Sequence, residues 1–209
     1  MFIKLILTSF RRAKLRNFFT FATYVVAFTL LGLLMPLDRV FSGGTSLADA
    51  NRLIVSNSMS IMQPLPETYV DRIEGVEGVG LAVPFTFFGG FYREPDNQIL
   101  AIATEPEKFV ALIDEVTFSQ PQEREVWFSN LRSVAIGRSL ADKYDWHVGE
   151  LISLYSLIYP KKNGSNSWTF EVAAIFDSDG DSGNTESLLI HNDYFNLNRL
   201  HGKDSVGWV

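Results

Sequence analysis

Hydrophobic and polar positions divide the chain into a short N-terminal part and a longer part with a different pattern. Residues 18–37 form a run of 20 residues without a charged side chain. A helix of that length spans roughly 30 Å, the thickness of the hydrocarbon core of a bilayer. Threonine hydroxyls within the run can donate hydrogen bonds back to their own helix, so lipid tolerates them. The run therefore predicts a transmembrane helix.

Charge differs sharply on the two sides of this run. The first acidic residue of the chain is Asp38, whereas five basic residues come before the run: Lys4, Arg11, Arg12, Lys14 and Arg16. Because basic flanks stay on the cytoplasmic side of a membrane, the N-terminus is predicted to be cytoplasmic and everything after the run extracytoplasmic. For residues 1–17 two interpretations stay open: a basic amphipathic segment in the inner-leaflet interface, or a plain basic flank.

Two alternatives to an anchor are disfavoured. A cleaved signal peptide has a shorter apolar core, and the small-residue pattern at Ala48-Asp49-Ala50 lies well beyond the end of the run. A helix buried in a soluble core needs a polar face, which residues 18–37 lack.

The pattern changes after a linker at residues 38–50. Short β-branched runs alternate irregularly with short helical stretches over residues 51–209. Strands are predicted at residues 52–60, 79–91, 98–103, 133–136, 151–159, 168–176, 187–191 and 205–209, and helices at 66–74, 106–113, 123–130, 138–144 and 193–197. This irregular order predicts one α+β domain with a mixed sheet.

Composition excludes several functions for this domain. After residue 37 the chain has 13 basic and 24 acidic residues, a net charge of −11, which disfavours nucleic acid as a partner. The absence of cysteine excludes disulfides, thiolate metal sites and cysteine nucleophiles. The sequence contains neither a P-loop nor a nucleophile elbow. We therefore predict a protein that is not an enzyme, with no catalytic residue, cofactor or metal ligand of its own.

Two groups of polar residues are candidates for metal sites. The stretch from Asp177 to Gly183 begins like a calcium loop, but Ser182 and Leu188 stand where the loop needs glycine and a bidentate glutamate. A solvated acidic loop is therefore predicted. The histidines are scattered and are assigned structural or surface roles: His147, His191 and His201.

A dense group of aromatic residues lies in the strand predicted at residues 79–91. Alternation along a strand buries only some side chains, so two interpretations stay open: core packing, or an apolar docking surface for a partner or lipid-like cargo. The candidate surface residues are Phe85, Phe87, Phe88, Phe91 and Tyr92.

Four segments follow one another in a recognisable order. The first is the basic segment and apolar run at 1–37. The second is a strand, a proline-led helix and a turn that ends in Gly75-Val76-Glu77-Gly78-Val79. The third is Ala135-Ile136-Gly137-Arg138-Ser139-Leu140-Ala141, followed by Val148-Gly149-Glu150, and the fourth is the strand Phe170-Glu171-Val172-Ala173-Ala174-Ile175-Phe176. With this order and spacing the chain resembles the MacB-like periplasmic core domain of FtsX-type ABC transporter permeases.

The resemblance implies the membrane subunit of a transporter in the bacterial inner membrane, with its large domain between the first two of four membrane helices. It implies a separate ABC-type ATPase as partner and a homo- or heterodimer of permeases. Export, efflux or the handling of lipoproteins is the implied activity. Since the chain stops at Val209 without the remaining helices, a fragment or a truncated product is expected. The alternative is a single-pass anchored binding or scaffold protein.

Overall fold

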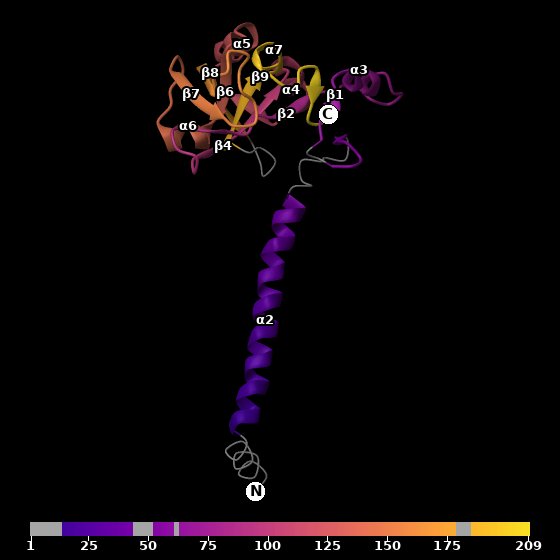
Figure 1. The fold of residues 1–209 in the computed structure, drawn as a ribbon, viewed down its shortest axis with the longest axis vertical. Helices are drawn as coiled ribbons and strands as arrows, with labels where there is room; N and C mark the ends of the chain where they lie inside the picture. Colours follow the sequence, from indigo (N-terminus) through magenta and orange to yellow (C-terminus); the bar gives the residue numbers. More distant parts are fainter. Residues whose placement is uncertain (1–13, 44–51, 61–62, 179–184) are drawn as a thin grey trace. The chain divides into compact units, whose positions relative to one another are not determined.

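The computed structural model describes residues 14–43, 52–60, 63–178 and 185–209. Its chain separates into two compact units, Met1–Arg52 and Leu53–Val209, which we call unit 1 and unit 2 and describe individually (Figure 1). Most of the basic segment predicted at 1–17, part of the linker and most of the acidic loop lie outside the described residues.

Unit 1 contains the 30-residue helix α2 (Lys14–Gly43), which extends past both ends of the predicted apolar run. Large apolar side chains along it are exposed: Leu15, Phe18, Phe19, Phe21, Tyr24, Val25, Val26, Phe28, Leu30, Leu31 and Leu34. Thr20, Thr23 and Thr29 each donate a hydrogen bond to the carbonyl four residues earlier, which confirms the interpretation of these threonines. Among the described residues, no helix combines the length and apolar character of a membrane span. The transmembrane helix therefore stays a prediction.

Unit 2 is built from ten strands and five helices among the residues described. The strands are β1 (Leu65–Pro66), β2 (Phe85–Phe87), β3 (Gly90–Phe91), β4 (Gln98–Thr104), β5 (Val116–Phe118), β6 (Ser133–Gly137), β7 (Leu151–Ser156), β8 (Ser167–Ser178), β9 (Ser187–His191) and β10 (Ser205–Val206). The helices are α3 (Thr68–Glu74), α4 (Pro106–Leu112), α5 (Pro121–Ser129), α6 (Arg138–Tyr144) and α7 (Asn192–Asn198). Prolines begin α4 and α5, where the missing N–H costs no helical hydrogen bond.

Strand β4 has partners along both edges. Strands β2 and β3 pair with it in succession on one edge, antiparallel, and β9 pairs with it in parallel on the other. From β3 the pairing continues through β7, β8 and β6 and returns to β9, so six strands form a closed ring. The β6–β8 pair is also parallel, and the remaining pairs of the ring are antiparallel. The predicted α+β fold with a mixed sheet is thereby confirmed.

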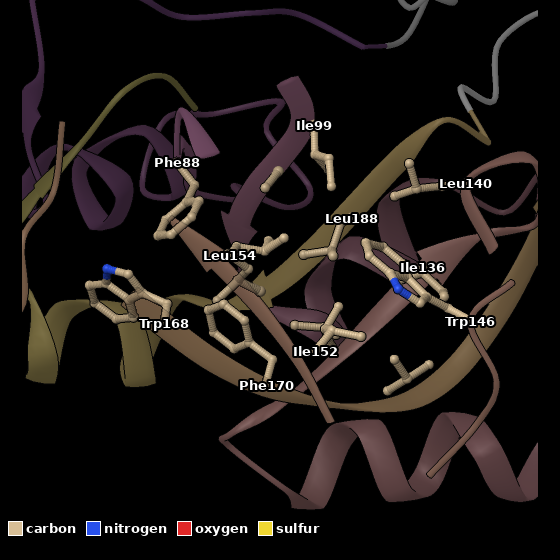
Figure 2. Close-up of a cluster of buried hydrophobic side chains, with 14 of the residues drawn as sticks. Phe88, Ile99, Ile136, Leu140, Trp146, Ile152, Leu154, Trp168, Phe170 and Leu188 are labelled. Atoms are coloured by element: carbon tan, nitrogen blue, oxygen red, sulfur yellow. The ribbon is translucent and has the colours of Figure 1, made fainter. Parts of the chain in front are cut away.

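The main core fills this ring of strands. Figure 2 shows Phe88, Leu154 and Phe170 pointing toward one another, together with side chains from the strands on the other side. Strand β4 contributes the small residues Ala101 and Ala103, both fully buried. A second cluster lies where α4 and α5 pack on the sheet: Phe109, Val116, Trp127, Ala135, Ala173, Ala174, Phe176 and Leu189.

A third, smaller cluster holds the two ends of unit 2 together. Strand β1 pairs with β10, and Leu65, Val70 and Val206 are buried in this cluster. Val55 and Val209 exchange both backbone hydrogen bonds, with N–O distances of 2.7 and 3.0 Å. The segment by which the chain comes into unit 2 is thus fixed to the last residues of that unit.

Two predicted strands are corrected. Residues 52–60 form no strand where they are described, and Leu53 and Ile54 are exposed there. The long strand predicted at 79–91 is reduced to β2 and β3, since Gly89 adopts a φ of 61° between them and interrupts the pleat. Strand β5 was not predicted, because three residues give too short a pattern to detect.

Replacing Phe88 is expected to test the position of the main core. Its side chain is fully buried, whereas the neighbouring Phe87 is 41% exposed. Phe88→Ala should lower the free energy of unfolding by about 3–5 kcal/mol, because it leaves a cavity among aromatic rings. The matched change Phe87→Ala should cost about 1 kcal/mol or less. Urea unfolding followed by tryptophan fluorescence measures both, and equal losses would contradict this placement.

Candidate docking surface

The shape of the aromatic segment depends on two consecutive glycines between β2 and β3. A Cβ on Gly90 would lie 2.6 Å from the Phe88 ring, so only glycine lets that ring turn into the core. A Cβ on Gly89 would lie 2.3 Å from the side chain of Ile158, which therefore packs directly over the backbone on the outer side. The pair places Phe88 inside the ring of strands and leaves the neighbouring aromatics on other surfaces.

The five aromatic residues proposed from the sequence as one surface are separated by the fold. Phe88 is removed from that set, because its ring packs edge-on against Trp168, Phe170 and Phe195 in the core. Its neighbours Phe85 and Tyr92 are half-buried.

These two half-buried rings have partners within the domain. Phe85 stacks on Trp208, with ring centroids 5.9 Å apart, and Tyr92 packs edge-on against Tyr144 and Trp146. Of the predicted set, Phe87 and Phe91 lie on the outer side of the strands away from the part that α4 and α5 cover, together with other apolar residues.

That outer side carries an apolar patch, which we call the apolar face and define by Phe87, Phe91, Leu100, Tyr155 and Ile158. Strand pairing brings these residues together, since Phe91 lies opposite Tyr155 and their rings stack at 5.7 Å. The exposed fractions are 41% for Phe87, 36% for Leu100, 40% for Tyr155 and 52% for Ile158. Phe91 is half-buried among them, and a contiguous, largely exposed apolar group of this kind is typical of a protein-binding surface.

Polar residues border the apolar face on β7 and β8. The hydroxyls of Ser153 and Thr169 lie 3.1 Å apart, and Arg132 Nε donates to the Thr169 carbonyl at 3.2 Å. Next to them, the Asn130 side-chain amide donates to the Glu171 carboxylate at 3.2 Å. An apolar centre with a polar border is the usual composition of a protein–protein interface. The sequence could not indicate Leu100, Tyr155 or Ile158, because they belong to other strands or to the loop after β7 and join the face only through the fold.

The residues predicted to set membrane orientation are only partly described. Lys4, Arg11 and Arg12 lie outside the described residues. Lys14 is the first residue of α2, and Arg16 is exposed one half-turn later. Their role in orientation therefore remains a prediction.

The titratable groups of unit 2 form ion pairs and structural hydrogen bonds. Arg138 Nη2 contacts the Asp177 carboxylate at 3.1 Å, and this hydrogen bond raises the arginine pKa above its ordinary value. The other predicted acids of that loop lie largely outside the described residues. Across the residues that are described, no three metal-binding side chains come together.

His191 is the one histidine of the three that the structure buries deeply. It is 4% exposed, and its Nε2 donates to the carbonyl of Trp127 at 2.5 Å. Burial lowers the pKa of His191, opposed by the Trp127 carbonyl and the charge of Asp193. The structural role predicted for this histidine fits the bond, because it ties β9 to α5.

The solved structures that are similar to the chain include the following two. One is a domain of a putative permease protein from Porphyromonas gingivalis, with 19% identity and a TM-score of 0.47, and the match covers 68% of this chain and 63% of that one. The other is the periplasmic region of MacB from Actinobacillus actinomycetemcomitans, with 12% identity, a TM-score of 0.48 and coverages of 74% and 70%. This chain spans less than two thirds of the first structure. No protein-family model and no curated protein matches it.

Acidification is expected to destabilise unit 2 through His191. Because its native pKa is lowered, the unfolded chain takes up a proton below about pH 6.5 while the native state does not. Stability should be unaffected by this group above pH 6.5 and fall below it, by up to about 1.4 kcal/mol per pH unit. His191→Gln should flatten this part of the profile. Urea unfolding at a series of pH values from 8 to 5 checks it, and an unchanged slope in the variant would contradict the assignment.

Proposed function

We propose that the chain is the N-terminal part of a permease-type membrane subunit of an ABC transporter, of the FtsX/MacB type. In this proposal α2 lies in the bilayer, unit 2 lies outside the cytoplasm, and a separate ATPase supplies the energy. The observation that carries the proposal is α2, since its apolar side chains are exposed and need an apolar solvent. The order of the sequence motifs in unit 2 supports the same assignment.

A transporter of this type has to pass movement from its membrane part to its outer domain. The described contacts offer a short path for this. Val55 is hydrogen-bonded to Val209, and the preceding Trp208 exchanges backbone hydrogen bonds with Phe85 at 2.9 and 3.0 Å. Phe85 belongs to β2, which pairs with β4 in the ring of strands. A pull on residues 53–55 is therefore delivered to the sheet through hydrogen bonds and one stacked aromatic pair.

The apolar face serves in this proposal as the surface on which a partner is held. It is formed by residues of β2, β3, β4 and β7 together with Ile158 of the following loop, and these strands pair in the order β2, β4, β3, β7. Partner and ATPase are thus linked through rigid elements, and unit 2 itself performs no chemistry. A homo- or heterodimer of such subunits is the assembly that we expect.

A topology experiment tests the placement of α2. A reporter that is active only outside the cytoplasm, fused after residue 60, should be active because the basic flank holds the N-terminus inside. Replacing Arg11, Arg12, Lys14 and Arg16 with alanine should lower reporter activity several-fold by mixing the two orientations. The same four-residue change made at Arg124, Arg132, Lys143 and Lys162 serves as the control. An inactive reporter in the native chain would refute the proposed topology.

Photo-cross-linking in membranes distinguishes the permease proposal from the alternative of an anchored scaffold protein. A photo-cross-linker at Arg16, on the predicted cytoplasmic side, should capture a protein that contains a P-loop ATPase domain. Capture of no such protein, with the reporter active, would favour the scaffold.

Breaking the Val55–Val209 pair should uncouple the first segment of unit 2 from the sheet. Val55→Pro removes the N–H that donates to Val209, and the amides of Phe85, Gly207 and Trp208 should lose protection from hydrogen exchange, by at least about tenfold. A proline at the exposed Leu53 is the control and should leave them protected. Retained protection in Val55→Pro would show that the path does not depend on this pair.

A further inference from the structure

The loop between β7 and β8 is joined by its backbone to the end of α7. Lys162 N donates to the Asn198 carbonyl, and Leu200 N donates to the Pro160 carbonyl, each at 2.8 Å. A further isolated bridge pairs Lys161 with Arg199. Two segments that are far apart in the sequence, residues 157–166 and 194–203, therefore form one continuous surface.

The buried side chain of Arg199 fixes the contact between these two segments. Its guanidinium is almost fully buried, lies over the rings of Tyr159 and Phe195, and donates to the Ser205 carbonyl at 2.6 Å. A second donor bond goes to Asn196. The β7–β8 loop, α7 and β10 are thus held by one side chain, and the surface above it has a defined shape.

The charge of this surface differs from that of the rest of unit 2. Residues 157–166 and 194–203 contain four basic residues and no acidic one, whereas the remainder of unit 2 contains 7 basic and 22 acidic residues. Lys162 and Lys203 are exposed, and Lys161 lies half-buried over the Trp168 ring. Asp193 and Asp204 mark the two ends of the second segment. An anionic surface would be repelled by most of unit 2 and attracted here.

The same surface exposes large aliphatic side chains among its lysines. Leu157 is 73% exposed, Leu197 57% and Leu200 45%, although leucine is ordinarily a core residue. Exposed aliphatic residues beside lysines are typical of protein surfaces that rest on the headgroup layer of a bilayer, where the leucines enter the acyl boundary and the lysines contact phosphates. We propose that this surface, which we call the hairpin surface and define by Leu157, Lys161, Lys162, Leu197, Leu200 and Lys203, docks on anionic phospholipid headgroups of the membrane that anchors the chain.

Two features favour lipid over an acidic protein partner. A lysine side chain is flexible and ends in a single ammonium group. It therefore lacks the bidentate geometry with which arginine typically selects a carboxylate. The leucines belong to two different segments that also carry lysines, which suits a fluid surface better than one fitted pocket. A tethered domain needs only weak attraction, since the anchor keeps its local concentration near the bilayer high.

The proposal rests on the anchored topology proposed above, so the experiment includes a separate check of it. The full chain lacks cysteine, and His201→Cys therefore places a single fluorescent label on the hairpin surface. Glu77→Cys, exposed after α3, is the control position. The labelled chains are reconstituted in vesicles of phosphatidylcholine alone or of an equal mixture with phosphatidylglycerol, each with headgroup-quencher lipid. Resistance to alkaline carbonate extraction reports anchoring independently of docking.

We expect the label at position 201 to be quenched in the anionic vesicles, weakly in neutral ones, and less in high salt. The triple variant Lys161→Gln, Lys162→Gln, Lys203→Gln should lower the docking equilibrium by roughly 100-fold, at about fivefold for each lysine. Leu157→Ser with Leu200→Ser should lower it as well. The matched variant Lys108→Gln, Arg124→Gln, Lys143→Gln, which removes the same charge elsewhere, should retain docking.

Quenching that is equal at positions 201 and 77, or that both triple variants reduce equally, would overturn the proposal. Absence of quenching at 201 in a chain that resists extraction would overturn docking and leave the anchor intact. Quenching abolished by added acidic peptide but insensitive to lipid charge would assign the surface to an acidic protein instead. A chain that carbonate extracts would refute the anchor, and docking to this membrane with it.

Discussion

Pairing of β4 along both of its edges is the constraint on which the rest of unit 2 depends. The ring of strands closes only because β9 adds in parallel to the edge of β4 that β2 and β3 leave free. Closure brings opposite strands close together, and Ala101 and Ala103 keep the inner side of β4 small enough for that. The space is then filled by Phe88, Phe170 and Trp168, whose rings meet edge-on or stacked at 5.5 to 6.2 Å. A larger residue on β4 would have to displace these rings from a close-packed interior.

Closing the ring also decides which surfaces remain apolar. Part of the outer side of the ring is covered by α4 and α5, which bury Trp127 and Phe109 against β8 and β9. Phe85 and Ile102, on β2 and β4, pack against this covered part. Two residues along the same strands and on the same side, Phe87 and Leu100 are exposed instead and belong to the apolar face. Helices cover the first part, and a bound partner would cover the second.

The sequence was sufficient where a short period and clear end signals coincide. Helix α6 and strand β9 lie at the predicted residues. Gly137 marks the start of α6, and an uninterrupted apolar run marks β9. The sequence pattern was insufficient where tertiary contacts set the backbone geometry. Aromatic density alone could not separate Phe87 from Phe88, since that depends on Gly89 and Gly90 and on what packs over them. The apolar face and the hairpin surface were equally hidden, because their residues are brought together from separate strands and from α7.

The two surfaces differ in what they can hold, and they meet at one loop. The apolar face has no lysine among its residues, and its border carries hydroxyls, an amide, one arginine and one glutamate, which suits a protein partner. The hairpin surface combines exposed leucines with lysines, which suits a charged bilayer. Ile158 belongs to the first and Leu157 to the second, so adjacent residues of one loop serve both. Docking of that loop on lipid would fix the direction in which the apolar face points. A partner bound there would then be presented at a set height above the membrane, and any movement delivered through Phe85 would act on it from a fixed orientation.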